Sequence, residues 1–271
     1  MNNIANKYKS VFRDIFSYRS YIVSSVKFEI YSKYKRSKLG LAWLFIQPFI
    51  QVLIYALVMS TILKAKIPGI DNINAYPIYI ISGIIGWIFF QDTLTRIVNV
   101  FTENTSLITK TLFPRIILPV MVLSLGLFNF FILMLITLLI FFFLGHYPYE
   151  YIFWIFILSF VLILLIFSIG LLMGLINVFF RDISQVVSLF LQLFFWFTPI
   201  VYSIDMVPDS FRSYFLLNPL YGVLSGFQNV LAFNNKPDLD LLIYPFLFGV
   251  TFLIIGIKAY KKISPHLGDY L

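Results

Sequence analysis

The chain alternates long apolar stretches with short polar joints, and six apolar stretches stand out. An α-helix rises about 1.5 Å per residue, so about 20 apolar residues cross the roughly 30 Å hydrocarbon core of a bilayer. Each stretch reaches or approaches that length, which predicts an all-α integral membrane protein with six transmembrane helices. The predicted spans are Leu41–Leu63, Tyr76–Thr93, Ile116–Leu144, Tyr151–Phe180, Ile183–Ser203 and Leu241–Tyr260.

Positive charge lies on alternate joints. Of the 20 Lys and Arg residues, sixteen lie in residues 1–40, in the joints after the second and fourth spans, and at the end of the chain. Short loops rich in Lys and Arg stay in the cytoplasm, so we expect both termini there. For most of these residues, setting the topology is a sufficient explanation. The other joints hold only Lys64, Lys66, Arg212 and Lys236.

Residues 11–36 predict a basic amphipathic helix in the cytoplasmic interface, because apolar residues recur at helical spacing with basic residues between them. Such a helix either anchors the chain or presents a cleft to a cytoplasmic partner. No cleavable signal is apparent, so we expect the first span to direct insertion. The chain divides into an interface segment, residues 1–40, and a membrane domain, residues 41–271.

Residues 204–238 contain a semi-apolar run, Tyr214–Phe233, that is long enough to suggest a seventh span. The run is interrupted by Asn218 and Pro219, and a seventh span would place the basic C-terminal tail outside the cell. Non-helical backbone survives at membrane depth only where protein or water satisfies it. We therefore predict a re-entrant extracytoplasmic helical hairpin between spans five and six, which is a candidate gate.

Polar and small residues within the spans suggest specific contacts. Asp92 and Arg96 lie one helical turn apart near the inner end of the second span, so we expect them to pair. Gly170 and Gly174 form a Gly-x-x-x-Gly pattern, which predicts close packing of the fourth span against another helix.

Composition narrows the function. Apolar residues make up 60% of the chain and charged residues 12%, against about 45–50% and about 25% in soluble domains. The net charge of +8 suits anionic lipid better than nucleic acid. The absence of cysteine excludes disulfides, thiolate metal sites and cysteine nucleophiles.

Several kinds of site are missing from the sequence. There is no P-loop for ATP, and His146 and His266 fall on opposite sides of the membrane, too far apart for a shared metal site. No carboxylate lies in the middle of a span, which argues against an ion-coupled carrier and against a membrane enzyme. Aromatic residues make up 20% of the chain. Most of them fit lipid-facing or interfacial positions, and the rest offer flat faces to the C–H faces of sugar rings.

Three sequence blocks occur in a specific order: NVFFRDI (177–183), LQLFFWFTPIVY (191–202) and LNPLY (217–221). Two earlier blocks, YKRSKLGLAW (34–43) and LITKTLFPR (107–115), belong to the same pattern. Together they resemble the membrane subunit of the type-2 ABC exporters for O-antigen, capsular polysaccharide and teichoic acid. The resemblance covers nearly the whole chain.

The resemblance implies a homodimer of six-span subunits around a central channel in the bacterial cytoplasmic (inner) membrane. It also implies two copies of a separate ABC ATPase subunit on the cytoplasmic face, which hold ATP and Mg. This chain is then expected to have no enzymatic activity and no cofactor of its own, and to bind no nucleic acid. The expected substrate is a polysaccharide carried on a polyprenyl diphosphate lipid.

The resemblance also suggests roles for individual residues. A coupling helix near 103–111 would meet the ATPase, although a polar loop with an anchoring arginine is the simpler explanation. An inner-turn pair would join the fourth and fifth spans, either as a local ion pair or as a functional feature. The coupling residues are Glu103, Lys110, Phe113, Pro114 and Arg115, and the inner-turn pair is Arg181 and Asp182.

Two further groups complete the expected sites. The basic end of the interface helix would contact the lipid diphosphate. Aromatic residues near the outer end of the fifth span, close to the hairpin, would line or gate the exit. The diphosphate contacts are Lys33, Lys35, Arg36 and Lys38, and the gate aromatics are Trp196, Phe197, Tyr202 and Tyr221.

Two other functions remain open. A type-2 ABC exporter of drugs or small lipids would share the six spans and the coupling loop, but the aromatic content favours a polymer. A six-span membrane lipid transferase would need carboxylates or histidines clustered at one face, and the sequence shows no such cluster.

Overall fold

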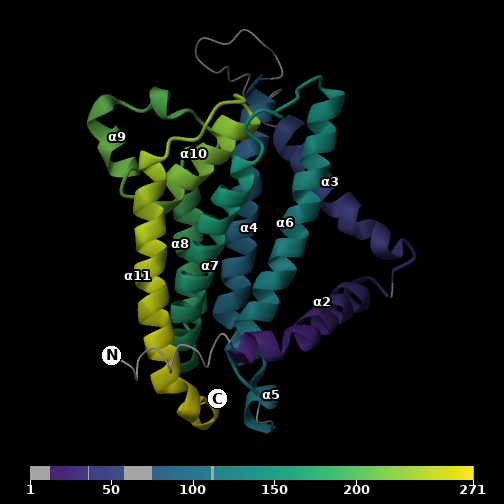
Figure 1. Cartoon of the computed structure of the whole chain (residues 1–271), viewed down its shortest axis with the longest axis vertical. Helices are drawn as coiled ribbons and strands as arrows, with labels where there is room; N and C mark the ends of the chain where they lie inside the picture. The colour runs from purple at the N-terminus through teal and green to yellow at the C-terminus, as the bar shows by residue number, and fades with distance from the viewer. Residues whose placement is uncertain (1–12, 36, 58–74, 111–112, 271) are drawn as a thin grey trace.

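The structure is a computed structural model that describes residues 13–35, 37–57, 75–110 and 113–270. Every regular element in these ranges is helical (Figure 1). The last six residues of the first predicted span, 58–63, and the following Lys64 and Lys66 lie outside the described residues. The α-helices are α2 Arg19–Tyr34, α3 Trp43–Leu57, α4 Ala75–Glu103, α5 Thr105–Lys110, α6 Ile117–Phe143, α7 Trp154–Phe179, α8 Ile183–Trp196, α9 Asp209–Phe215, α10 Pro219–Leu231 and α11 Asp240–Ile263.

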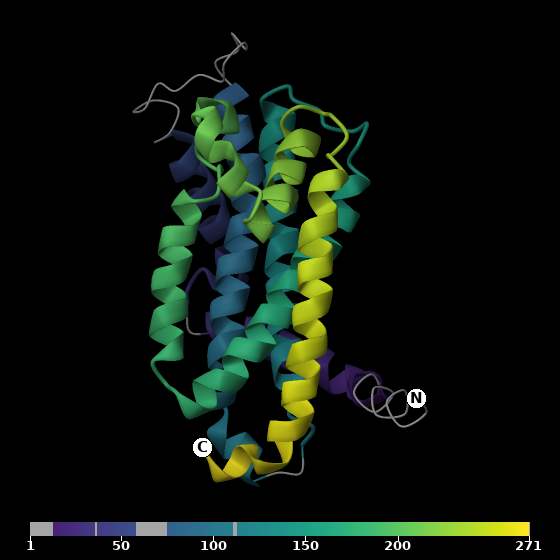
Figure 2. The same ribbon diagram turned by 90° about the vertical axis from the view of Figure 1, so that its left-hand side faces the viewer.

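Four long helices, α4, α6, α7 and α11, run side by side as a bundle (Figures 1 and 2). Each of them is long and apolar enough to cross a membrane. The predicted all-α fold is therefore confirmed for the described residues, and four apolar helices agree with a membrane protein. The first and fifth predicted spans correspond to the shorter apolar helices α3 and α8, and their crossing of the membrane remains a prediction.

Helix α4 lies at the centre of the bundle and packs against α3, α6, α7, α8 and α10. Close contact with α7 depends on the two glycines of the predicted packing motif. A Cβ atom on Gly170 would come 2.8 Å from Cγ2 of Ile97, and one on Gly174 would come 2.9 Å from the Ile97 carbonyl oxygen. Both distances are too short for a side chain, so the packing role of this motif is confirmed.

Two helix ends differ from the sequence prediction. Helix α4 continues ten residues past Thr93 to Glu103, because Leu94, Ile97, Val98 and Phe101 lie on one buried face of an amphipathic extension. Helix α8 ends at Trp196, seven residues before the predicted end of the fifth span. The residues that follow it are apolar, so hydropathy alone could not mark this end.

Helix α2 lies across the lower part of the bundle rather than along it (Figure 1). The predicted apolar stripe is only partly buried, since Ile22 and Tyr34 are buried whereas Phe16 and Val23 are exposed. A basic helix with exposed apolar side chains suits the interface of a membrane.

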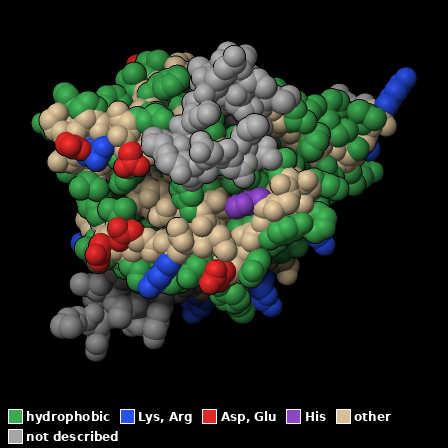
Figure 3. All heavy atoms as spheres, turned by 90° about the horizontal axis from the view of Figure 1, so that it is seen from above, with side chains coloured by type: hydrophobic (Ala, Val, Ile, Leu, Met, Phe, Trp, Pro, Cys, Tyr) green, Lys and Arg blue, Asp and Glu red, His purple; other side chains and the backbone are tan. Residues whose placement is uncertain are grey.

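The two ends of the bundle differ in charge. The lower end of Figure 1 carries α2, α5 and a C-terminal 3₁₀ turn, η4 (Ser264–Asp269), and it holds most of the described basic residues. The upper end shows several carboxylates on its surface (Figure 3). This separation agrees with the predicted orientation, in which the basic end faces the cytoplasm. The acidic residues near the upper end are Glu150, Asp205, Asp209, Asp238 and Asp240.

Helices α9 and α10 lie at the upper end and form a V whose point is directed into the bundle (Figures 1 and 2). Residues 216–218 connect them, and α10 packs against α4, α7 and α11. The region therefore contains two short helices in place of one long span, and their re-entrant position in a membrane remains a prediction.

Because the chain contains no cysteine, each single cysteine variant carries one thiol. We expect Ser106→Cys on α5 and Pro265→Cys on η4, both exposed at the lower end, to react with a membrane-impermeant maleimide from the same side of the membrane. Ser213→Cys on α9 should react from the opposite side. Labelling of all three variants from one side would contradict the arrangement.

Candidate functional site

A polar cavity of about 560 Å³ lies beside the middle turns of α4 and α6. Its wall combines side-chain amides and hydroxyls with aromatic rings, and it is contributed by α2, α3, α4, α6 and α8. A cavity of this size falls in the range of small-ligand sites. The polar wall residues include Gln47, Gln51, Gln91, Asp92, Thr93, Thr95, Asn129 and Ser188, and the aromatic ones include Tyr34, Trp87, Phe89 and Phe130.

Thr93 is the most deeply buried polar group of this cavity. Thr93 is 1% exposed, and its hydroxyl has no hydrogen-bond partner among the residues that the structure describes. A Cβ atom on Gly126 would lie 2.2 Å from the Thr93 Oγ1 atom, so only glycine at that position leaves room for the hydroxyl. Burying a hydroxyl without a partner costs free energy, about 1–3 kcal/mol in proteins. The fold therefore carries an unsatisfied polar group in the cavity wall.

Charges of both signs lie at the lower rim of the cavity, where Lys33 and Asp92 contribute to its lining. The expected pairing of Asp92 with Arg96 is wrong. Arg96 instead forms an ion pair with Glu29 of α2, which ties the interface helix to α4. Sequence spacing favoured the neighbour one turn away, whereas folding brings Glu29 next to α4 from a distant part of the chain.

At the upper end, the chain leaves α8 in a non-helical stretch, residues 197–203, that α4 and α10 hold in place. The Tyr76 hydroxyl donates to the Val201 carbonyl at 2.6 Å, and the Tyr79 hydroxyl lies 3.2 Å from the carbonyl oxygen of Tyr202. The Gln228 amide, 4% exposed, donates to the carbonyl of Pro199 at 3.3 Å. These side chains supply the donors that the missing helix would have supplied.

Asn218 joins the same stretch to the start of α10. Its Oδ1 atom accepts from the Leu220 backbone N–H at 2.8 Å and caps α10, while its Nδ2 atom donates to the Thr198 hydroxyl at 2.8 Å and to the Phe197 carbonyl at 3.1 Å. All three interactions are typical of an asparagine N-cap that also bridges to a neighbouring segment. Blocks 191–202 and 217–221 of the sequence thus form one connected unit.

The four predicted gate aromatics belong to this unit. Trp196 and Phe197 are 63% and 64% exposed, and the Tyr202 hydroxyl donates to the Trp196 carbonyl at 2.7 Å. Tyr221 is half-buried on α10.

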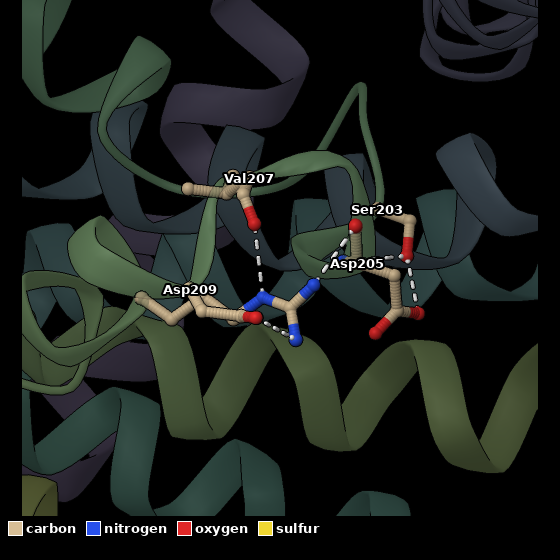
Figure 4. Close-up of polar contacts among 5 residues, drawn as sticks. Ser203, Asp205, Val207 and Asp209 are labelled. Carbon is tan, nitrogen blue, oxygen red and sulfur yellow. Dashed lines mark hydrogen bonds and ion pairs between the residues drawn. The ribbon is translucent and has the colours of Figure 1, made fainter.

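Arg212 closes the loop that leads to α9. Its guanidinium lies between the Val207 carbonyl and the Asp209 carboxylate (Figure 4), with Nε and Nη1 each 2.9 Å from those oxygens. Nη2 donates to the Asp205 carbonyl at 2.9 Å. The Ser203 hydroxyl contacts the Asp205 carboxylate at 3.0 Å. Arg212 is therefore engaged in holding this loop.

At the lower end, α5 follows α4 after a single residue, Asn104. Glu103 and Lys110 are exposed, whereas Ile108 is buried and seats α5 on the bundle. The predicted coupling segment extends to residue 111, which lies outside the described residues. The charged side chains of Glu103 and Lys110 are thus exposed at the two ends of this segment, and α5 packs against η4.

The other predicted coupling residues are partly enclosed. Phe113 contacts the rings of Tyr18 and Tyr21 with centroids 5.4 Å and 5.1 Å apart, in edge-on geometry. Pro114 and Arg115 are also half-buried. Phe113 therefore contacts the N-terminal helical segment, and all three residues are less exposed than Glu103 and Lys110.

Asn177 fixes the turn between α7 and α8. Its Nδ2 atom lies 3.1 Å from the Val98 carbonyl oxygen and 3.3 Å from Oδ1 of Asn99, and its Oδ1 atom accepts from the Ser184 backbone N–H at 3.1 Å. Asn177 is 2% exposed. Sequence analysis placed it in a family block without assigning it a role, and its position as a lone amide within an apolar run is the signal that could have identified it.

Arg181 and Asp182 are both exposed at this turn. Within the described residues they form no ion pair with each other, so the turn is held by Asn177 rather than by a salt bridge. Arg181 instead lines a second, smaller cavity of about 250 Å³ together with Asn99, Thr102, Thr105, Asn177 and Ser184.

The expected diphosphate contacts lie at the C-terminal end of α2 and just beyond it. Lys33, Lys35 and Lys38 are exposed, and Arg36 lies outside the described residues. The Lys33 ammonium lies 5.4 Å from the centroid of the Tyr34 ring, on the side of the polar cavity. The structure therefore brings one of these lysines to the cavity rim.

Comparison with known proteins gives consistent matches. The ABC-2 type transporter family matches residues 21–232. The O-antigen export system permease protein RfbA of Myxococcus xanthus is 30% identical over 234 residues, covering 85% of this chain and 87% of that protein. RfbA of Klebsiella pneumoniae is 25% identical, covering 88% and 90%. The polysialic acid transport protein KpsM of Escherichia coli is 22% identical, covering 86% and 89%.

Removing the Asn177 amide should loosen the turn between α7 and α8. We expect Asn177→Ala to lower stability by about 1–3 kcal/mol, because it leaves the half-buried Ser184 N–H without its acceptor. Ser184→Ala is the matched control, since it keeps that N–H and removes only an exposed hydroxyl contact. The measurement is the thermal unfolding midpoint in detergent, and equal midpoints for the two variants would refute the role of Asn177.

Proposed function

Because this chain belongs to the ABC-2 type transporter family, we propose that it is the channel-forming membrane subunit of an ATP-driven exporter of a lipid-linked polysaccharide. The observation that carries the proposal is similarity along most of the chain to proteins named for O-antigen export and for polysialic acid transport. Both of those named substrates are polysaccharides. The names favour this function over export of drugs or small lipids, and the family match favours it over a lipid transferase.

Six crossings per subunit fit the arrangement of the helices. The four long helices supply four crossings, and α3 and α8 supply the first and fifth. Helix α8 has 14 residues, which corresponds to about 21 Å, so residues 197–203 would complete its crossing. The hydrogen bonds to that stretch make the proposal feasible, because backbone carbonyls in contact with lipid would otherwise have no hydrogen-bond donor. In this arrangement α9 and α10 form a re-entrant hairpin, and both termini are cytoplasmic.

We place the subunit in the bacterial cytoplasmic (inner) membrane as a homodimer. Helices α3 and α8 present exposed apolar side chains, including Phe45 and Phe49 on α3 and Leu189 and Phe190 on α8. A second copy of the chain would cover part of this surface and enclose a channel between the subunits. Exposed apolar area of this kind supports association within a membrane, where close packing provides the attraction.

Two copies of a separate ABC ATPase would dock at the lower, basic end, and ATP and Mg would be bound there rather than in this chain. Helix α5 is the proposed contact, with Glu103 and Lys110 exposed and Ile108 anchored in the bundle. Because α5 follows α4 almost directly, a displacement of α5 would act on the central helix of the bundle. Phe113, Pro114 and Arg115 would keep the loop rigid enough to transmit that displacement.

The substrate would approach along the cytoplasmic interface. Lys33, Lys35 and Lys38 would attract the diphosphate of the carrier lipid, since clustered ammonium groups bind phosphate oxygens strongly. Arg36 belongs to the same group by sequence. At the far end, Trp196, Phe197, Tyr202 and Tyr221 would form the exit, where aromatic faces let a polymer slide because no single contact is strong.

The coupling role of α5 can be tested by reversing its two exposed charges. We expect the double variant Glu103→Lys with Lys110→Glu to lower polymer-stimulated ATP hydrolysis by roughly tenfold, the equivalent of about 1.4 kcal/mol of lost interaction. The measurement uses the purified complex with its cognate ATPase and the lipid-linked polymer. Glu150→Lys, at the upper end, is the matched charge-reversal control and should leave hydrolysis unchanged.

A further variant addresses the possibility that α5 tolerates charge reversal. Replacing Glu103, Lys110 and Arg115 together by alanine removes every charged group of the segment. Assembly with the ATPase and export that both remain at the level of the parent protein would show that α5 is not the coupling element.

A further inference from the structure

Four charged side chains lie where α2 meets α4, and one ion pair joins the two helices. Glu29 of α2 pairs with Arg96 of α4, and both side chains are partly exposed. Lys33 and Asp92 have no ion-pair partner among the described residues. Both of them line the polar cavity. The pairing between the helices thus leaves one charge of each sign at the rim of that cavity.

Each helix offers a different pairing of the same four charges. Lys33 follows Glu29 by four residues on α2, and Arg96 follows Asp92 by four residues on α4. An acidic residue four positions before a basic one is the order in which such a pair stabilises a helix. Two pairs within the helices would satisfy all four charges, whereas the observed pair satisfies two. The structure therefore departs from the arrangement that local spacing favours, and such departures are expected at functional sites.

The surroundings of Glu29 show what Arg96 prevents. Among the residues three or four positions from Glu29 on α2, only Lys33 is charged. The other residues at that spacing are Ser25, Val26 and Ser32. Without Arg96, the Glu29 carboxylate would have Lys33 as its partner on the same helix. Because Arg96 binds that carboxylate, the Lys33 ammonium stays unpaired.

The Lys33 ammonium is placed to bind an anion at the rim of the cavity. It lies 5.4 Å from the centroid of the Tyr34 ring, and that ring is buried whereas Lys33 is exposed. A cation over an aromatic ring keeps its charge and its N–H donors. An ammonium group with three donors binds phosphate oxygens strongly when no carboxylate neutralises it.

We propose that Arg96 is a positioning residue for binding of the carrier-lipid diphosphate, because its ion pair with Glu29 keeps Lys33 free to contact the phosphate oxygens. The proposal rests on the function proposed above, since that function supplies the diphosphate lipid. Arg96 acts through Glu29 and needs no contact with the lipid. The same ion pair fixes α2 to α4, so the position and the availability of Lys33 depend on one interaction.

The test compares Arg96→Gln with Glu29→Gln in the assembled transporter without nucleotide. Both variants break the same ion pair between α2 and α4, but only Arg96→Gln leaves a free carboxylate one helical turn from Lys33. The probe is radiolabelled polyprenyl diphosphate, titrated in nanodiscs of phosphatidylcholine, a lipid without net charge. The matching polyprenol, which has no phosphate, reports whether the prenyl chain still binds.

We expect Arg96→Gln to weaken diphosphate binding roughly threefold, because the freed carboxylate competes for Lys33 and repels the phosphate. Glu29→Gln should bind at least as tightly as the parent protein, and the double variant should bind like Glu29→Gln. Lys33→Gln should remove most of the effect of Arg96→Gln. Binding of the polyprenol should be the same in all of these proteins.

Equal weakening by Arg96→Gln and Glu29→Gln would overturn the proposal, because the contact between α2 and α4 would then be all that matters. Binding by Arg96→Gln with the affinity of the parent would also overturn it, as would an undiminished effect of Arg96→Gln in the Lys33→Gln background. Displacement of the probe by an equal concentration of phosphatidylglycerol would overturn the assignment of the ligand, since any lipid phosphate would then suffice.

Two further outcomes separate this proposal from the proposed function. A parent protein that does not bind polyprenyl diphosphate would overturn the role of Arg96, and the proposed function would stand if the lipid-linked polymer still stimulated ATP hydrolysis. Diphosphate binding that Arg96→Gln weakens and Glu29→Gln does not, without any stimulation by that polymer, would support the role of Arg96 and contradict export of that polymer.

Discussion

The structure depends on the hydrogen bonds that the backbone forms after the end of α8. A helix satisfies its own N–H and carbonyl groups, but residues 197–203 are not helical and lie against the upper part of the bundle. The Tyr76 and Tyr79 hydroxyls and the Asn218 and Gln228 amides supply the missing donors. Without them several buried carbonyls would face an apolar medium, at a cost of several kcal/mol for each unsatisfied group. The positions of α9 and α10 follow from the same bonds, because Asn218 both caps α10 and holds the stretch after α8.

A buried side-chain amide also holds the chain together at the opposite end of α4. Asn177 bonds to the Val98 carbonyl and to Asn99 near the lower end of α4, and it also holds the first turn of α8. Helix α8 is thus tied at both of its ends to α4, through Asn177 below and through the two tyrosines above. Because α5 continues from α4, the proposed contact with an ATPase and the proposed exit are joined by one helix of 29 residues. A rigid element of this kind is a physical route by which an event at one end can reach the other.

Hydropathy located the long helices well. It failed where a helix is amphipathic, where a loop is apolar, and where residues far apart in the sequence come into contact. The predicted stretch Ile116–Leu144 differs from α6 by one residue at each end, since both ends coincide with a change from apolar to polar residues. The lower part of α4 was missed because it is amphipathic, and the end of α8 was missed because the chain stays apolar beyond Trp196. Exposure of Glu103 and Lys110 could be expected from their charge alone. The cavity could not, because its amides come from helices far apart in the sequence, and neither could the Glu29–Arg96 pair.

A comparison of the buried polar side chains shows which of them stabilise the fold by hydrogen bonding. Asn177, Asn218 and Gln228 are each less than 10% exposed, and each has hydrogen-bond partners in the protein. These residues stabilise the fold, because their bonds offset the cost of burying an amide. Thr93 is buried to the same degree and stabilises nothing by hydrogen bonding, although a valine of the same shape would avoid the penalty. The three buried amides thus have partners, whereas Thr93 and Thr137 carry buried hydroxyls that have none among the described residues.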